Sequence, residues 1–220
     1  MAQRLHIRQN TPLVHPENQK GNGLGTRLGL QAVTDFYTYV ALQGMVYQVR
    51  AGTVTTPLVG DVAITDTAAE MALDAASGGT IIPVSLQIST RLLTGTLHEY
   101  AAKSVGTVSS AGAAFTPLNL RNSGGQALPS QISARVAAAG GVTVTAELAT
   151  TTRRHWEHAN PAAGATGALP SDNIVPLWEP RCPPVLQGAW SFYVQIAATG
   201  TGPSYFAHLD AICALTATLL

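Results

Sequence analysis

Residues 131–150 alternate apolar and polar side chains on both sides of a pair of glycines. The alternation runs from Ile132 to Val136 before Gly140-Gly141 and resumes at Val142 after it. Alternation with a period of two predicts half-buried strands, and two adjacent glycines accept the positive φ angles of a tight primed turn. The segment therefore predicts a β-hairpin with one face towards a core and one face towards water.

Two further parts of the chain repeat this pattern. Residues 81–89 alternate after Gly78-Gly79, and residues 71–76 alternate before it, although the capping-box spacing of Thr67 and Glu70 leaves a helix over 61–76 as the alternative. Residues 190–196 and 205–213 alternate on either side of a turn at 200–203. We therefore expect three hairpins, each with an apolar inner face and a nearly uncharged outer face that suits packing against another subunit.

The remaining periodic segments are shorter. Residues 35–50 are rich in β-branched and aromatic residues, which favours one long bent strand or two short strands with Gly44 as a bulge or turn. Residues 96–105 and 111–120 are further predicted strands, and Pro83 belongs at a strand start or a sheet edge because it cannot donate a ladder hydrogen bond. About eight to ten strands without a long amphipathic helix predict an all-β antiparallel sandwich or barrel.

Two stretches lack any periodicity. Residues 1–34 contain prolines, glycines and one acid, Glu17, and we interpret them as an extended N-terminal arm held by a neighbouring subunit. Residues 35–220 are then a single β-sandwich domain. Within it, residues 160–184 hold six prolines, and a long irregular connection of this kind is typically functional or covered by a partner. The basic residues of the arm are Arg4, Arg8, Lys20 and Arg27.

Composition changes the picture at the surface. Only 11% of the 220 residues are charged and 46% are hydrophobic, whereas about 25% charged is usual. So little charge indicates that much of the surface is covered by protein, most simply by other copies of the chain. The 12 basic and 12 acidic residues cancel, so no strong field attracts nucleic acid or an anionic membrane. The chain shows neither the ~18-residue apolar run of a membrane span nor the apolar region of a signal peptide.

The sequence RRHWEH at 153–158 gathers several side chains with potential chemistry. Histidine and carboxylate are zinc ligands, but on an extended strand His155 and Glu157 share one face while His158 points away. The two arginines beside the tryptophan could contact phosphate or stack on a base. A polar strand end that contacts another subunit is the simpler interpretation.

The other candidates for chemistry are weaker still. His208 and Asp210 share a face of the last predicted strand, but no GxSxG motif accompanies them, so we interpret them as the polar face of a half-buried strand. The glycine-rich GNGLG at 21–25 does not match GxGxxG. Cys182 and Cys213 allow one disulfide, but both are interpreted as packed, inert thiols. We therefore predict no catalytic, cofactor-binding or metal-ligating residue and no enzymatic activity.

Two longer runs resemble a known family. EMALDAASGGTIIPVSLQIS at 70–89 and SFYVQIAATGTGPSYFAHLDAI at 191–212 are similar to segments of bacterial-virus virion proteins that adopt a jelly-roll fold. The resemblance covers roughly residues 59–212. It implies a jelly-roll-like β-sandwich of two sheets packed face to face, in a subunit of the capsid shell or of a capsid-bound decoration layer. It transfers no catalytic residue.

Two functions remain in view. The first is a structural virion protein that self-assembles, through arm and loop exchange, into a capsid shell or its decoration layer. The alternative is a carbohydrate- or receptor-binding β-sandwich module of a virion spike or tail, with tryptophans and tyrosines stacking on sugars. The expected partners are copies of the chain and other virion proteins, with no membrane, no cofactor, no small-molecule substrate and only weak nucleic-acid contact through the arm. The expected location is the virion, after synthesis in the host cytoplasm.

Overall fold

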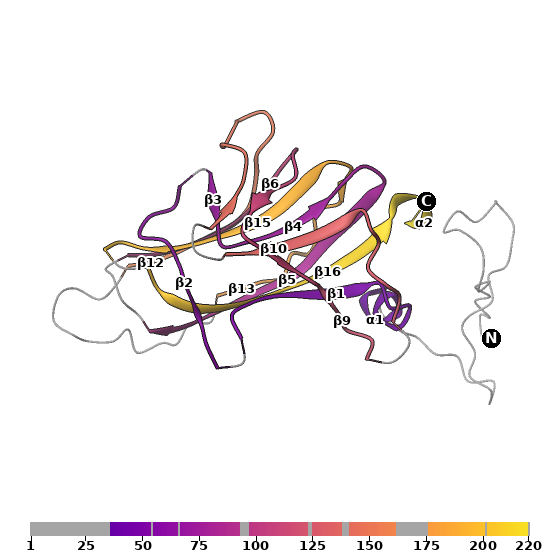
Figure 1. The fold of residues 1–220 in the computed structure, drawn as a ribbon, viewed down its shortest axis with the longest axis horizontal. Coiled ribbons are helices and arrows are strands. Elements are labelled where there is room, and N and C mark those ends of the chain that lie inside the picture. Colours follow the sequence, from indigo (N-terminus) through magenta and orange to yellow (C-terminus); the bar gives the residue numbers. More distant parts are fainter. Residues whose placement is uncertain are drawn as a thin grey trace, which may run out of the picture.

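The computed structural model describes residues 36–53, 55–65, 67–92, 97–122, 125–137, 141–161, 176–200 and 202–219. Its paired strands are antiparallel and form three sheets, with short helices at one end (Figure 1). Two of the sheets enclose one large apolar core, which confirms the prediction of an antiparallel all-β sandwich. The arm predicted over 1–34 lies outside the described residues, as does most of the predicted loop at 160–184.

The first sheet has seven strands and is built around the last strand of the chain. The strand β16 (Ser204–Leu215) lies between β5 (Gly79–Leu92) and β1 (Val46–Ala51). Four two-residue strands complete the sheet. These are β13 (Leu177–Trp178) and β14 (Leu186–Gln187) on β5, β9 (Leu118–Asn119) on β1, and β2 (Leu58–Val59) on β16.

The second sheet has six strands. The strand β15 (Trp190–Ala198) lies between β6 (Leu97–Val105) and β4 (Met71–Ala75). A third, small sheet contains β3 (Ala68–Ala69), β11 (Val142–Thr143) and β7 (Ser110–Ala111). The six-stranded sheet is completed by β12 (Arg153–Pro161) on β6, β10 (Ile132–Val136) on β4, and β8 (Ala113–Phe115) on β10.

None of the three predicted hairpins forms, although five of their six strands do; the strand predicted beyond Gly141 is reduced to the two residues of β11. The strands β4 and β5, on either side of Gly78-Gly79, lie in different sheets, and so do β15 and β16. The strand β10 pairs with β4 and β8, whereas β11 beyond Gly141 pairs with β3 and β7. Each glycine turn therefore carries the chain from one sheet to another. Both edges of β10 are already paired, so β11 has no free edge of β10 to join.

The predicted strand over 35–50 is wrong in its first half. Residues Phe36–Leu42 form the helix α1, and β1 begins at Val46. Gly44, at φ 74°, ends the helix, with the Gly44 N–H on the Ala41 carbonyl (2.9 Å) and the Met45 N–H on the Val40 carbonyl (3.2 Å). This is the hydrogen-bond pattern of a Schellman cap. Val40 packs on the outer face of the seven-stranded sheet, and that tertiary contact outweighs the strand propensity of the sequence.

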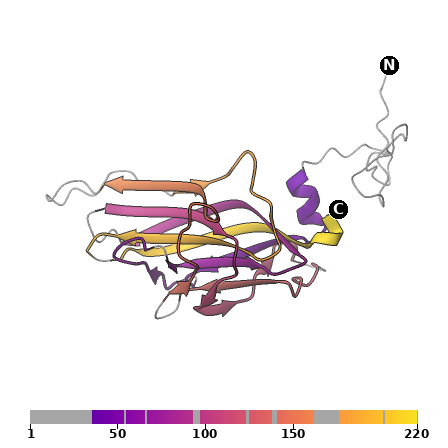
Figure 2. The same cartoon turned by 90° about the horizontal axis from the view of Figure 1, so that it is seen from above.

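Two smaller features follow from local geometry. The strand predicted over 111–120 is divided among β7, β8 and β9, because Ala111 and Gly112 both take positive φ angles (55° and 68°). Pro83 lies inside β5 and not at its start, but neither β14, which pairs with residues 80–81, nor β13, which pairs with 86–87, covers the other side of β5 there, as the predicted edge position requires. Its partner is Ala211 of β16, beside a register shift at which Val84 is an extra residue in β5. The bulge lets the ladder tolerate a residue without an N–H. The C-terminal helix α2 (Thr216–Leu219) lies at the same end as α1 (Figure 2).

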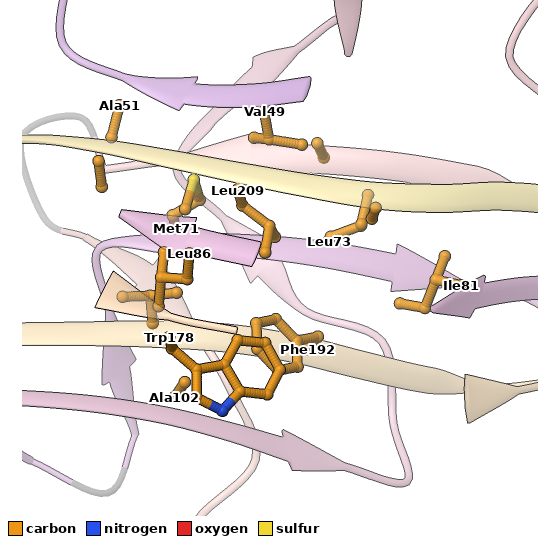
Figure 3. Close-up of a cluster of buried hydrophobic side chains, with 14 of the residues drawn as sticks. Val49, Ala51, Met71, Leu73, Ile81, Leu86, Ala102, Trp178, Phe192 and Leu209 are labelled. Atoms are coloured by element: carbon orange, nitrogen blue, oxygen red, sulfur yellow. The ribbon is translucent and has the colours of Figure 1, made fainter. Parts of the chain in front are cut away.

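The main core lies between the two large sheets (Figure 3). The Phe192 ring of β15 stacks against Trp178 of β13, at 5.4 Å between ring centroids, and Met71 and Leu73 of β4 are fully buried nearby. Truncating a buried Leu or Met of this kind to Ala typically costs about 2–5 kcal/mol. These contacts fix the six-stranded sheet against the seven-stranded sheet.

The outer face of the six-stranded sheet is covered by this same chain. Tyr193, Ala72 and Val105 of that sheet pack with Val142 and Val144, and Ala69 of the small sheet joins them. The expectation that a neutral outer face at β15 packs against another subunit is therefore wrong for this region. The insertion between β6 and β12, which carries β7 and β11, supplies the cover instead.

Candidate functional site

A charged groove of about 850 Å³ lies on the outer face of the six-stranded sheet, beside the small sheet. Its floor is β6, where Glu99, Ala101 and Lys103 occupy alternate positions. Its sides are formed by Arg154 and residues 157–159 of β12 and by residues 64–65 of the loop before β3. The groove holds five of the 24 charged side chains of the chain, and this concentration of charge makes it the candidate functional site.

A bulge in β12 determines which side chains enter the groove. The register with β6 shifts between Arg154 and Trp156, so His155 and Trp156 both lie on the core side. His158 stacks on Tyr100, another core residue, at 6.0 Å between ring centroids. The prediction that His155 and Glu157 share a face is therefore wrong, whereas Glu157 and His158 lie on opposite faces, as predicted. His155 is the extra residue of the bulge, and this places it on the same side as Trp156.

Two cations and two carboxylates in the groove form a connected network. The Lys103 Nζ lies 3.1 Å from Glu147 Oε2, and Arg154 lies 2.6 Å from Glu147 Oε1 and 2.9 Å from Glu157 Oε1. Partial burial opposes ionisation of Glu147, but the hydrogen bonds from Arg154 and Lys103 outweigh it and lower the pKa of this carboxyl. Lys103 is almost fully buried, so Glu147 is the partner that allows a charged amine at this position.

Glu99 is the third carboxylate of the groove, and it is half-buried. Within the described ranges it forms no ion pair. The loop opposite is held by Gln195, whose Nε2 donates to the carbonyls of Thr65 and Ala68. The groove therefore has three carboxylates against two cations, and the carboxylate on its floor is the one without an ion pair among the described residues.

The histidines of β12 and β6 face apolar surroundings. His155 contacts Phe192 (5.7 Å between ring centroids), and its Nε2 lies 2.8 Å from the Ser104 hydroxyl. Burial, followed by the charge of Arg153, lowers the pKa of His155, and burial alone lowers the pKa of His98. Within the described ranges, no three His, Cys, Asp or Glu side chains lie close enough together to hold a metal ion.

The two arginines of RRHWEH already have partners in this chain. The Arg153 guanidinium lies 6.0 Å from the centre of the Trp190 ring, and Arg154 belongs to the ion-pair network. All three tryptophans pack in or against the main core: Trp178 is buried, and Trp156 and Trp190 are partly exposed.

His208 and Asp210 share the outer face of β16, as predicted. Asp210 accepts hydrogen bonds from Gln48 Nε2 (3.0 Å) and Ser85 Oγ (3.2 Å), which ties three strands together. His208 lines a second hollow of about 380 Å³, together with Arg50 and other residues. The remaining lining residues are Gly52, Thr53, Gln87, Ser89 and Phe206.

The cysteines do not form a disulfide, and only one of them fits its prediction. Cys213 is buried in the main core, and burial raises the pKa of its thiol, so it is an inert apolar residue. Cys182 is exposed, which contradicts the expectation that it is packed. The adjacent prolines, Pro180, Pro183 and Pro184, do not bury its side chain.

A buried carboxyl, Glu70, lies next to the exposed Asp61, beside the start of β16. Glu70 is only 4% exposed, and it accepts hydrogen bonds from the Tyr205 hydroxyl (3.0 Å) and the Asp61 N–H (3.2 Å). Burial, followed by the nearby charge of Asp61, raises the pKa of Glu70 to about 7. Burial and Glu70 also raise the pKa of Tyr205, so its hydroxyl remains a donor.

An apolar surface patch is formed by α1 and β9. Leu42 of α1 is 59% exposed. The two elements are joined by Asn119, whose Nδ2 donates to the carbonyls of Gly44 (2.7 Å) and Gln126 (3.0 Å). Both elements lie at the end of the sandwich where the described chain begins (Figure 1). The exposed members, hereafter the α1–β9 patch, are Tyr37, Tyr39, Leu42, Leu118 and Leu120.

Sequence reasoning missed the groove and the α1–β9 patch. A signal for part of the groove was present, because Glu99 and Lys103 are four apart on a predicted strand and must share a face. Glu147 is distant in sequence, and no pattern indicates that it meets Lys103. The patch was hidden because α1 was predicted to be a strand.

No family model, curated protein or solved structure matches this chain. No helix in the described part of the chain has the length and apolar character needed to span a membrane.

Proposed function

We propose that this chain is a structural virion protein, a jelly-roll subunit that assembles with copies of itself into the capsid shell, or its decoration layer, of a bacterial virus. The order of the strands supports the jelly roll. One sheet contains the order β1-β16-β5-β13, and the other contains β4-β15-β6-β12. Counted along the chain, these eight long and short strands run 1-8-3-6 and 2-7-4-5, the arrangement that two interleaved Greek keys require.

The additional strands extend this pattern without breaking it. The insertion between β6 and β12 adds β10 and β8 beyond β4, and it adds β9 beyond β1. The same insertion thus caps one edge of both large sheets. Capped edges limit uncontrolled strand pairing between copies. We therefore expect copies to contact each other through side chains and not through main-chain pairing of strand edges.

The α1–β9 patch is the observation that carries the proposed assembly. Five large apolar or aromatic side chains on two adjoining elements are at least 37% exposed. Contiguous exposed apolar residues mark interaction surfaces on soluble proteins. The low overall charge and the neighbouring N-terminal segment, from which the chain enters α1, fit a contact at this end. A virion location and virion partners belong to the same proposal.

The test is the mass of the native protein in solution, measured by sedimentation velocity and light scattering. We expect a closed oligomer for the full chain. Leu42→Gln keeps a good helix former but removes an exposed apolar side chain. It should weaken association about tenfold, since burying a leucine contributes about 1.5–3 kcal/mol and 1.4 kcal/mol is a factor of ten.

Val59→Gln is the matched control, because Val59 is 66% exposed but lies in β2, which pairs with the first residues of β16, whereas α1 packs near Ile212 towards the other end of that strand. Neither substitution should change the unfolding midpoint in urea of the dissociated protein. Equal weakening by both substitutions would refute the α1–β9 patch as the contact. A strictly monomeric full chain would refute assembly and favour the binding-module alternative.

A further inference from the structure

The charged groove over β6 and β12 has a natural occupant in the sequence of this protein. We propose that the groove receives the basic N-terminal segment, residues 1–34, of a neighbouring copy. The inference rests on the proposed self-assembly and adds the receiving site, which nothing else in the chain assigns. The groove carries three carboxylates and two cations, and Glu99 on its floor has no ion pair within the described residues.

Charge complementarity is the first argument. Residues 1–34 hold four basic side chains and one acid, whereas residues 35–220 hold eight basic and eleven acidic side chains. The chain is neutral only as a whole, with a basic first part and an acidic remainder. Arginine is the best cation for such a pairing, because its planar guanidinium binds a carboxylate through two hydrogen bonds. Three of the four basic residues of the segment are arginines.

The shape of the groove favours an extended segment. Ala101 on the floor and Ala159 on the wall are small, so a main chain can lie close to β6 and β12 between the charged side chains. Lys103 is held down by Glu147 and is nearly buried, so it does not block the floor. A glycine-rich peptide, such as residues 20–29, has little side-chain bulk to exclude.

The groove lies at the end of the sandwich opposite the start of the described chain, and residues 1–34 are long enough to reach it from the same chain or from a neighbour, so the test has to separate the two. The described chain begins at α1, whose Val40 packs near Val46 and Ile212, close to the C-terminal end of β16. Glu99 pairs with Ala197, next to the 199–203 turn at the opposite end of the sandwich. Thirty-four residues can span at most about 110–120 Å when extended, which is ample to reach an adjacent copy.

The test places a photo-crosslinking residue, p-benzoylphenylalanine, at Ala159 of the full-length chain. Light and 15N-labelled chains are dissociated, mixed and reassembled before irradiation, and cross-linked peptides are identified by mass spectrometry. We expect cross-links from position 159 to residues 1–34, with mixed light and heavy pairs. The same residue at Thr53, in the other hollow, is the control and should not reach residues 1–34.

Each outcome bears on the proposal. Oligomers in which position 159 captures only other segments, or captures residues 1–34 only from the same isotopic chain, would overturn the groove assignment and leave self-assembly intact. A chain that never assembles would overturn both proposals. Glu99→Gln should raise the dissociation constant about two- to fivefold and reduce its salt dependence, as for loss of one exposed ion pair. Glu179→Gln, an exposed acid elsewhere, should change neither quantity.

Discussion

The buried carboxyl of Glu70 should make the stability of this protein fall as the pH rises through the neutral range. Its pKa in the folded chain is about 7, above its ordinary value of 4.5. Below pH 4.5, both the folded and unfolded chains hold the proton, so the group costs nothing. Between pH 4.5 and 7 only the folded chain keeps it, and the free energy of unfolding therefore decreases with pH. Above pH 7 the full cost is present.

The size of this cost follows from the two pKa values. From 4.5 to about 7, at 1.36 kcal/mol per pH unit, the cost is about 3 kcal/mol. Only 4% of Glu70 is exposed, so screening by solvent reduces it little. Glu70→Gln removes the charge, and the amide can still bond with both the Asp61 N–H and the Tyr205 hydroxyl.

The assay is urea unfolding at pH 5 and pH 8, followed by tryptophan fluorescence at one protein concentration. Other titrating groups contribute alike to both proteins, so the informative quantity is the difference between wild type and Glu70→Gln. We expect the wild type to lose about 2–3 kcal/mol more than the variant between the two pH values. Parallel losses in the two proteins would show that Glu70 is ionised in the fold at pH 5, and the reasoning would fail.

Two further variants test the groove and the helix cap, both by urea unfolding. Glu147→Gln leaves the nearly buried Lys103 without a carboxylate and should cost about 2 kcal/mol, whereas Glu157→Gln, at a side chain 51% exposed, should cost less than about 0.5 kcal/mol; similar costs would contradict the burial argument. Gly44→Ala should cost about 2 kcal/mol, because φ is 74° and a Cβ would lie 2.9 Å from the Gln126 nitrogen. Gly200→Ala, with positive φ but open space around the new Cβ, should cost about 1 kcal/mol. If both substitutions cost the same, the contact with the Gln126 nitrogen does not contribute to the cost at Gly44.

The groove was only partly accessible from sequence. Alternation along 97–105 places Glu99 and Lys103 on one face, and this much is local information. Glu147 reaches Lys103 because the insertion between β6 and β12 folds back over the sheet, and no local pattern encodes that return. The shared face of His155 and Glu157 was predicted wrongly, because the bulged residue between Arg154 and Trp156 shifts the alternation by one position.

The sequence by itself determined where the long strands run and, for strands without a bulge in their own chain, which side faces inward. The inward positions of β4, β10, β15 and β16 all follow the predicted alternation, and their side chains lie in the main core. Period-2 alternation requires only that one face be apolar, so it holds equally whether the next strand lies alongside or across the core. The glycines at 78, 141 and 200 have positive φ angles. A turn of this kind can lead either to a neighbouring strand in the same sheet or to a strand in another sheet.

Only the tertiary structure decided which strands pair. Hydrogen-bonded pairing depends on which strand edges are free once the whole chain has collapsed. The edges of β4 are taken by β15 and β10, so β5 crosses to the opposite sheet and packs its apolar face against β4. The same competition decided that residues 36–42 form a helix, because burial of Val40 against Val46 and Ile212 outweighs a propensity that favours strand. Short-range pattern specifies burial, and long-range competition for edges and surfaces specifies topology.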